Sequence, residues 1–316
     1  MKVNGTHTRT VWVERDGVTV GTIDQTLLPH RYVTIRLETE YNNRARVPEH
    51  PEIFARWKRD AAAYRERMQA EESAELGLAY ASGARPHVDL FFPDTTGHTP
   101  LALFIHGGYW RSLEPSTFSH MSAGLNARGI AVAVAGYELC PQVTILQIIE
   151  QIRTACLFLW RRFGQRLMVY GHSAGGHLAA CMVATDWKKL DPKAPADLVP
   201  AGYSISGLFD LKPLAATAMN TDLRLTDASA AQVSPLWWPV PRGTAFDAVV
   251  GGAESREFLR QSRTLADDWR QRGVETRYEE VPGANHFTVL DPLSDPASAM
   301  TARCAALAAR CAKVDK

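Results

Sequence analysis

The sequence has few of the features that mark membrane, secreted or nucleic-acid-binding proteins. No apolar run approaches the roughly 18 residues that a membrane span requires, and the opening MKVNGTHTRT lacks the apolar core of a secretory signal. Lys and Arg number 35 against 34 Asp and Glu, and this net charge of +1 provides no basic surface for nucleic acid or an anionic membrane. We therefore expect a cytoplasmic protein that binds a small molecule in a pocket, and neither nucleic acid nor membrane.

Cysteine is scarce and scattered. The five cysteines are an odd number, are widely spaced and include no C-x-x-C pair, which argues against a disulfide framework and a structural zinc site. The H-E-x-x-H metal motif and the phosphate-binding G-x-x-x-x-G-K-[ST] motif are missing as well. The sequence therefore predicts buried free thiols, no metal and no cofactor.

Strand and helix patterns alternate over most of the chain. From about residue 85, continuous apolar runs are separated by amphipathic segments such as 143–162, 175–186 and 257–271. This alternation is typical of an α/β fold with a mostly parallel sheet and helices on both faces, which binds ligands at the carboxyl ends of its strands. The expected strands are 87–92, 101–106, 130–137, 166–172, 201–206, 245–252 and 276–281.

Two other regions differ from this pattern. Residues 1–39 are predicted to form a β-rich appendage, a small antiparallel meander with strands at 11–13, 18–23 and 32–37. A helix is expected over 51–73, and residues 40–316 form the main domain. Within that domain, 212–241 is longer than an ordinary connection and is expected to form a cap over the site.

The sharpest chemical signal is a G-x-S-x-G motif, which runs from Gly171 to Gly175 between an apolar strand and a helical segment. A strained turn of this kind lifts the serine hydroxyl into the open, and glycines two residues to either side avoid backbone clashes. Serine is a poor nucleophile until a base removes its proton. Ser173 is the predicted nucleophile.

A second signal is HGGYW at 106–110, at the end of an apolar strand. Gly107 and Gly108 can present bare N–H groups to a developing oxyanion, and the N–H of Ala174 at a helix start supplies another. His106 is interpreted as a residue that orders this loop. A plain tight turn is the alternative interpretation.

The remaining members of a triad are expected in the order serine, acid, histidine. His286 follows the last expected strand and is the predicted base. Glu254 follows the strand before it and is the predicted acid. Asp247 and Glu257 are the alternatives, and each is otherwise interpreted as a solvated charge or a charge at a helix N-terminus. Other histidines are interpreted as structural or surface residues: His172, His177, His120, His30 and His50.

From about residue 40 to its end, the chain resembles the arylformamidase (kynurenine formamidase) and esterase branch of the α/β-hydrolase superfamily. The segments that carry the resemblance are EYNNRARVPEHPEIFARW at 40–57, HGGYW at 106–110, GHSAGGH at 171–177, SGLFDLKPL at 206–214, ESREFLRQS at 254–262 and ANHF at 284–287. The resemblance implies an α/β-hydrolase fold and assigns the triad to Ser173, His286 and Glu254. The acid is usually Asp in the vertebrate enzymes of this family, so Glu254 is a departure.

Residues 1–39 resemble the opening strands of methylthioribose-1-phosphate isomerase. The fragment stops short of that enzyme's catalytic regions, so isomerase activity is not expected to follow from it. We expect it to pack on the hydrolase or to mediate self-association into a homo-oligomer.

These signals predict a serine hydrolase that cleaves short-acyl carboxylic esters through a Ser–His–Glu triad and an acyl-enzyme. Arylformamidase activity on N-formylkynurenine is the alternative; a noncatalytic binding protein and an isomerase-related role of the N-terminal segment are weaker ones. The residues expected in the substrate pocket are Tyr109, Trp110, Phe209, Trp237, Trp238 and Phe287. For Trp237 and Trp238, burial in the core of the cap is an equal alternative.

Overall fold

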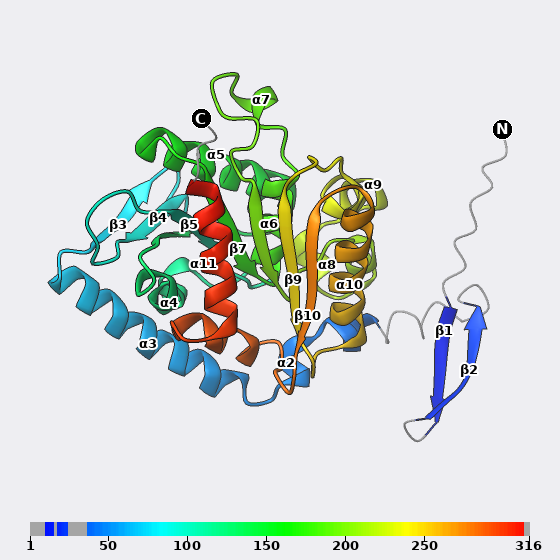
Figure 1. Cartoon of the computed structure of the whole chain (residues 1–316). Helices are drawn as coiled ribbons and strands as arrows, with labels where there is room; N and C mark the ends of the chain where they lie inside the picture. Colours follow the sequence, from blue (N-terminus) through cyan, green and yellow to red (C-terminus); the bar gives the residue numbers. More distant parts are fainter. Residues whose placement is uncertain (1–9, 16–17, 25–36, 313–316) are drawn as a thin grey trace.

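The computed structural model describes residues 10–15, 18–24 and 37–312 of the chain. Its central element is an eight-stranded sheet with the order β10-β9-β8-β7-β5-β6-β4-β3 (Figure 1). The strands are β3 (Ala74–Ala79), β4 (His87–Phe91), β5 (Leu101–Ile105), β6 (Ala131–Ala135), β7 (Leu167–His172), β8 (Ala201–Ile205), β9 (Ala245–Gly251) and β10 (Glu275–Val281).

The sheet is mostly parallel, as the alternation of strands and helices predicts. β4 pairs antiparallel with both β3 and β6, and every pairing from β6 to β10 is parallel. The strands from β5 to β9 are buried along their whole length because helices cover both faces, which explains their continuous apolar sequences. The α/β-hydrolase fold is confirmed.

Helices cover each face of the sheet with a separate hydrophobic cluster. α3 (His50–Ala70), α4 (Ala123–Asn126) and α11 (Ala299–Ala312) pack on one face. α5 (Ile145–Phe163), α6 (Ala174–Val183) and α10 (Arg256–Gln271) pack on the other. Every described helix is too short or too polar to cross a membrane.

The helix boundaries follow local signals. At the start of α5, the Thr144 side chain accepts from the N–H of Gln147 while the Gln147 side chain returns the contact, which is a capping box. At its end, Gly164 has a φ of 66°, the left-handed conformation that glycine adopts without strain. The helix therefore covers the expected amphipathic segment with its apolar side against the sheet.

The N-terminal hairpin consists of β1 (Thr10–Arg15) and β2 (Val18–Asp24), which pair antiparallel. The predicted third strand at 32–37 lies outside the described residues except for Leu37, which starts a helical turn over 37–41. A second short helix, α2 (Asn43–Arg46), follows. The expected boundary at residue 39 therefore falls inside a helical turn.

The expected cap over 212–241 contains only short elements. They are η3 (Lys212–Ala216), α8 (Asn220–Leu223), α9 (Asp227–Gln232) and η4 (Pro235–Trp237). Much of the segment packs into the core cluster beside α6 and α10, and Met219 and Asp222 reach the pocket described below. The segment thus forms one edge of the site.

Candidate active site

Ser173 lies on the sharp turn between β7 and α6. Its φ of 55° and ψ of −115° are a strained conformation for a residue with a side chain. The neighbouring glycines are sterically required, because a Cβ on Gly175 would lie 1.9 Å from the carbonyl oxygen of Ile105 and one on Gly171 would lie 2.4 Å from that of Gly175. The turn can therefore form only with glycine at both positions.

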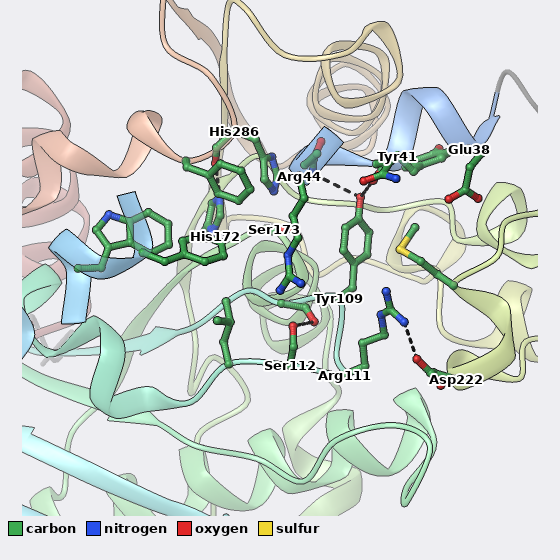
Figure 2. A pocket seen from close by; sticks show the side chains of 18 residues that line it. Glu38, Tyr41, Arg44, Tyr109, Arg111, Ser112, His172, Ser173, Asp222 and His286 are labelled. Atoms are coloured by element: carbon green, nitrogen blue, oxygen red, sulfur yellow. Dashed lines mark hydrogen bonds and ion pairs between the residues drawn. The ribbon is translucent and has the colours of Figure 1, made fainter. Parts of the chain in front are cut away.

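His286 and Glu254 come from the ends of neighbouring parallel strands, β10 and β9. His286 Nδ1 donates to Glu254 Oε2 at 2.6 Å, and both side chains are buried. This bond fixes the ring with Nε2 available to accept a proton. Ser173 and His286 line one pocket (Figure 2), so the structure brings together the three residues that the sequence nominated.

Two further groups hold the Glu254 carboxylate. The hydroxyl of Ser206 and the N–H of Gly251, at 2.7 Å, both donate to its Oε1. Ser206 directly follows β8 and has a φ of 55°. Sequence reasoning missed Ser206; the available signal was a serine at the carboxyl end of the strand that neighbours the one bearing the acid.

The rival carboxylates have other partners. Asp247 accepts from Arg303 Nε at 2.7 Å and Nη2 at 3.0 Å, at the far end of β9 from Glu254. Glu257 accepts from the hydroxyl of Tyr41 at 2.7 Å and pairs with Arg260. Of the three candidates, Glu254 is the one that contacts His286.

The loop after β5 lies against the serine. A Cβ on Gly107 would lie 3.1 Å from the Cβ of Ser173, so this backbone packs directly beside the turn. Gly108 lines the pocket with a φ of 110°, and its carbonyl accepts from Ser112 Oγ at 2.9 Å. Within residues 37–312, the N–H groups of Gly107, Gly108 and Ala174 donate to no other protein group, and they remain available to an oxyanion.

His106 is buried beside this loop and contacts its backbone. It stacks on Tyr137 with a centroid distance of 4.4 Å and on Phe118 at 5.7 Å, and its Nδ1 donates to the Gly107 carbonyl at 2.7 Å. Burial lowers the pKa of His106 to about 3. The ring is therefore neutral, and its place under the loop matches the interpretation of its role.

The other histidines also make structural contacts. His172 Nε2 donates to the backbone carbonyl of His286 at 2.8 Å, and burial together with the nearby His286 ring lowers its pKa well below the usual value. His177 Nε2 donates to the Val233 carbonyl at 2.7 Å, and burial lowers the pKa of His177 to about 4. His120 is buried, His50 bonds the Val47 carbonyl, and His30 lies outside the described residues.

The pocket above Ser173 has a volume of about 350 Å³. One wall comes from the loop after β5 and another from the segment 38–57, which sequence reasoning did not connect with the site. Tyr109 joins the two walls, because its hydroxyl donates to the Tyr41 carbonyl at 2.6 Å. The residues of the unexpected wall are Glu38, Tyr41, Asn42, Asn43, Arg44, Phe54 and Trp57.

Of the six aromatic side chains expected in the pocket, Tyr109 and Phe287 line it. Trp110 and Phe209 are fully buried in the core, where Trp110 meets His177 edge-on at 5.0 Å and Phe209 meets Phe246 at 6.2 Å. Near the end of the expected cap, Trp237 is 57% exposed and Trp238 packs against the core, so these four side chains have places other than the pocket wall.

All five cysteines are buried and free, as the sequence predicts. Burial raises the pKa of Cys140 to about 11, so this thiol stays protonated at neutral pH. The thiols therefore supply no second nucleophile to the site.

Comparison with known proteins agrees with this geometry. Residues 102–290 match a family model described as the α/β-hydrolase fold. The chain belongs to the α/β-hydrolase family. This α/β hydrolase is 29% identical over 240 residues to a kynurenine formamidase of Salmo salar, covering 73% of this chain and 80% of that protein. It is 30% identical over 227 residues to a kynurenine formamidase of Drosophila melanogaster, covering 68% and 75%.

A solved structure is also similar along nearly its whole length. A protein described as a "putative thioesterase" from Silicibacter sp. TM1040 is 34% identical, with a TM-score of 0.75 over 84% of this α/β hydrolase and 97% of that chain. Together these relatives make the protein an arylformamidase-like α/β hydrolase. The resemblance of residues 1–39 to an isomerase is not shown by the comparisons and stays a prediction.

Proposed function

We propose that this α/β hydrolase cleaves aryl formamides of the N-formylkynurenine type through Ser173, His286 and Glu254. The observation that carries the proposal is the 2.6 Å bond from His286 Nδ1 to Glu254 at the edge of the pocket that contains Ser173. The curated relatives named kynurenine formamidase support a formamide over the short-acyl ester that the motifs first suggested.

The chemistry begins with attack of Ser173 Oγ on the formyl carbon while its proton passes to His286 Nε2. The oxyanion that forms accepts hydrogen bonds from the N–H groups of Gly107, Gly108 and Ala174. Collapse breaks the carbon–nitrogen bond, and His286 gives the proton to the departing aryl amine. A formyl ester remains on Ser173.

Water completes the cycle. His286 takes a proton from a water molecule that attacks the formyl ester, and the second tetrahedral intermediate releases formate and the free serine. Glu254 holds the ring in the required tautomer and stabilises its positive charge in each half-reaction. No cofactor is required by this sequence of steps.

The pocket wall suits an aryl leaving group. Phe54 meets Phe287 edge-on with a centroid distance of 5.0 Å, and Trp57 meets Phe287 at 6.1 Å. Such rings pack well against another aromatic ring. A formyl group is small, so the leaving group occupies most of the cavity.

Short-acyl ester hydrolysis is the second candidate. The same nucleophile, base and oxyanion donors act on an ester carbonyl, and the solved relative with 34% identity carries a thioesterase description. The cytoplasmic location and the self-association that the sequence analysis expects also remain predictions.

The test compares kcat/KM for N-formylkynurenine with that for p-nitrophenyl acetate and butyrate on one preparation. We expect the formamide to be preferred. Ser173→Ala should lower kcat for every substrate by about three orders of magnitude or more while the melting temperature stays near that of the wild type. Turnover at the wild-type rate in this variant would exclude the proposed mechanism, and an ester preference would favour the second candidate.

A further inference from the structure

The charged side chains around the pocket are not all compensated. Arg111 pairs with Asp222, and Glu38 accepts from the N–H of Ala218 at 2.9 Å. Arg44 also lines the pocket, and among residues 37–312 no carboxylate pairs with it. The site therefore holds one arginine whose charge has no protein counter-ion in the described part of the chain.

The position of Arg44 is set by the unexpected wall. It projects from the two-turn stretch formed by 37–41 and α2, and its guanidinium lies 5.8 Å from the centroid of the Phe54 ring. This cation–π contact orients the group without neutralising it. In Figure 2, Arg44 points into the cavity, and Tyr109 stands between it and Glu38.

We propose that Arg44 is the anion-binding residue of this site and selects substrates whose leaving group carries a carboxylate. The inference rests on the proposed hydrolase function and deepens it. A guanidinium presents parallel N–H donors that match the two oxygens of a carboxylate. Arg44 is exposed to solvent, so salt screens its attraction for an anion, and the two parallel hydrogen bonds give the contact its selectivity.

The size of the acyl group assigns the carboxylate to the leaving group. A formyl or acetyl carbon bound at Ser173 fills little of the 350 Å³ cavity, so the remaining space, including the part next to Arg44, receives the departing portion. The neighbouring rings of Phe54 and Trp57 hold an aryl group, and the guanidinium faces a substituent on it.

The test uses two aryl acetates of the same shape, 3-acetoxybenzoate and its uncharged methyl ester. The wild type should favour the anion in kcat/KM. Arg44→Gln should reduce the anion-to-ester ratio by at least about fivefold, mainly through a higher KM for the anion. Raising the ionic strength should weaken the preference in the wild type and have little effect in the variant.

Arg46→Gln is the matched control, because Arg46 is exposed and lies on the same short helix, as Arg44 does, but it does not line this pocket. It should leave the ratio unchanged. Arg44→Lys keeps the charge and should retain most of the preference. Equal losses in Arg44→Gln and Arg46→Gln, or a loss in Arg44→Lys as large as in Arg44→Gln, would overturn the inference.

Failure of this inference differs from failure of the proposed function. Hydrolysis of both acetates and of N-formylkynurenine by the wild type, with the same ratio in Arg44→Gln, would refute only the role of Arg44. If none of the three substrates is hydrolysed, the proposed function and the inference fall together.

Discussion

Glu254 is a carboxylate with no exposed side-chain surface, and three donors from separate parts of the chain hold it: His286 Nδ1, Ser206 Oγ and the N–H of Gly251. A buried charge is tolerated only when it is paired and hydrogen-bonded. The acid therefore depends on Ser206 as well as on its bond to the base.

Ser206→Ala removes one of these donors and leaves Glu254 Oε1 with the Gly251 N–H alone. We expect the free energy of unfolding to fall by about 1–3 kcal/mol and kcat to fall by about tenfold or less, because the bond to His286 remains. Urea unfolding and steady-state kinetics with p-nitrophenyl butyrate measure the two effects.

Ser204→Ala is the control for this prediction. Ser204 lies two residues earlier on β8, is equally buried, and its hydroxyl has no hydrogen-bond partner among the described residues. Its removal should leave kcat and stability almost unchanged. A similar loss of kcat in both variants would show that packing in this strand, rather than the bond to Glu254, supports the site.

At the scale of elements, the site depends on how closely α6 approaches the end of β5. Gly175 lies in the first turn of α6, against the carbonyls of Ile105 and His106. This approach places the start of the helix beside the loop that holds Gly107 and Gly108. The contact of Gly175 with these carbonyls therefore positions β5, α6 and the loop that holds Gly107 and Gly108 relative to one another.

Gly175→Ala should force these elements apart, because the added methyl group would lie 1.9 Å from the carbonyl oxygen of Ile105 and 2.8 Å from that of His106. We expect a loss of stability of about 3 kcal/mol or more, together with a large loss of kcat. Thermal unfolding and ester hydrolysis measure both.

Gly164→Ala provides the comparison. It follows α5 with a φ of 66° and has no atom within 4 Å of an added Cβ, so it should cost only about 1 kcal/mol from backbone strain and leave kcat unchanged. A mild effect of Gly175→Ala, similar to that of Gly164→Ala, would contradict the close contact.

At the scale of the whole molecule, every residue of the described site lies within residues 37–312. The segment that begins at residue 37 contacts two distant parts of the chain, as the bonds from the Ala218 N–H to Glu38 and from the Tyr109 hydroxyl to the Tyr41 carbonyl show. The useful boundary for removing the N-terminal appendage therefore precedes residue 37 and not residue 40.

Deleting residues 1–36 should leave kcat/KM for p-nitrophenyl butyrate within about threefold of the full chain. Deleting residues 1–46 should remove most activity, because Tyr109 loses its acceptor and one pocket wall disappears. Loss of activity in the shorter deletion would mean that the hydrolase depends on the appendage or on assembly through it.

Acid should destabilise the folded molecule through its buried histidines. The pKa of His106 is lowered to about 3 and that of His177 to about 4 by burial, whereas in the unfolded chain both lie near 6.5. Between these values the unfolded state binds protons that the folded state does not, so the free energy of unfolding falls as pH drops below 6.5. Each histidine should contribute up to about 1.4 kcal/mol per pH unit, and this full slope is reached only well below pH 6.5.

Urea unfolding at several pH values between 7.5 and 5 tests this dependence. His177→Gln keeps an N–H donor for the Val233 carbonyl but cannot be protonated. The free energy of unfolding of this variant should therefore fall less steeply with decreasing pH, and the slope should be smaller by the contribution of one histidine. An unchanged slope in this variant would mean that His177 is protonated in the folded state.

The apolar runs predict most of the sheet because each of its central strands is buried on both faces and reads as one continuous segment. β3 escapes this reasoning: its sequence, AELGLA, contains a glycine and a glutamate, and it pairs antiparallel at the edge of the sheet with most of its residues partly exposed. Its position comes from pairing with β4, a long-range contact that no local pattern encodes.

Chain order and local chemistry alone nominate Ser173, Glu254 and His286, because parallel strands that run in one direction must end at the same edge and carry their following residues there together. Which side chains complete the site depends on contacts between segments far apart in the chain. Arg44 and Tyr41 come from a helical stretch outside the sheet, Ser206 from a strand with no catalytic motif, and Trp237 is turned to solvent. Such placements follow from packing and hydrogen bonding across the folded chain, where the environment of each side chain is set by residues dozens to hundreds of positions away.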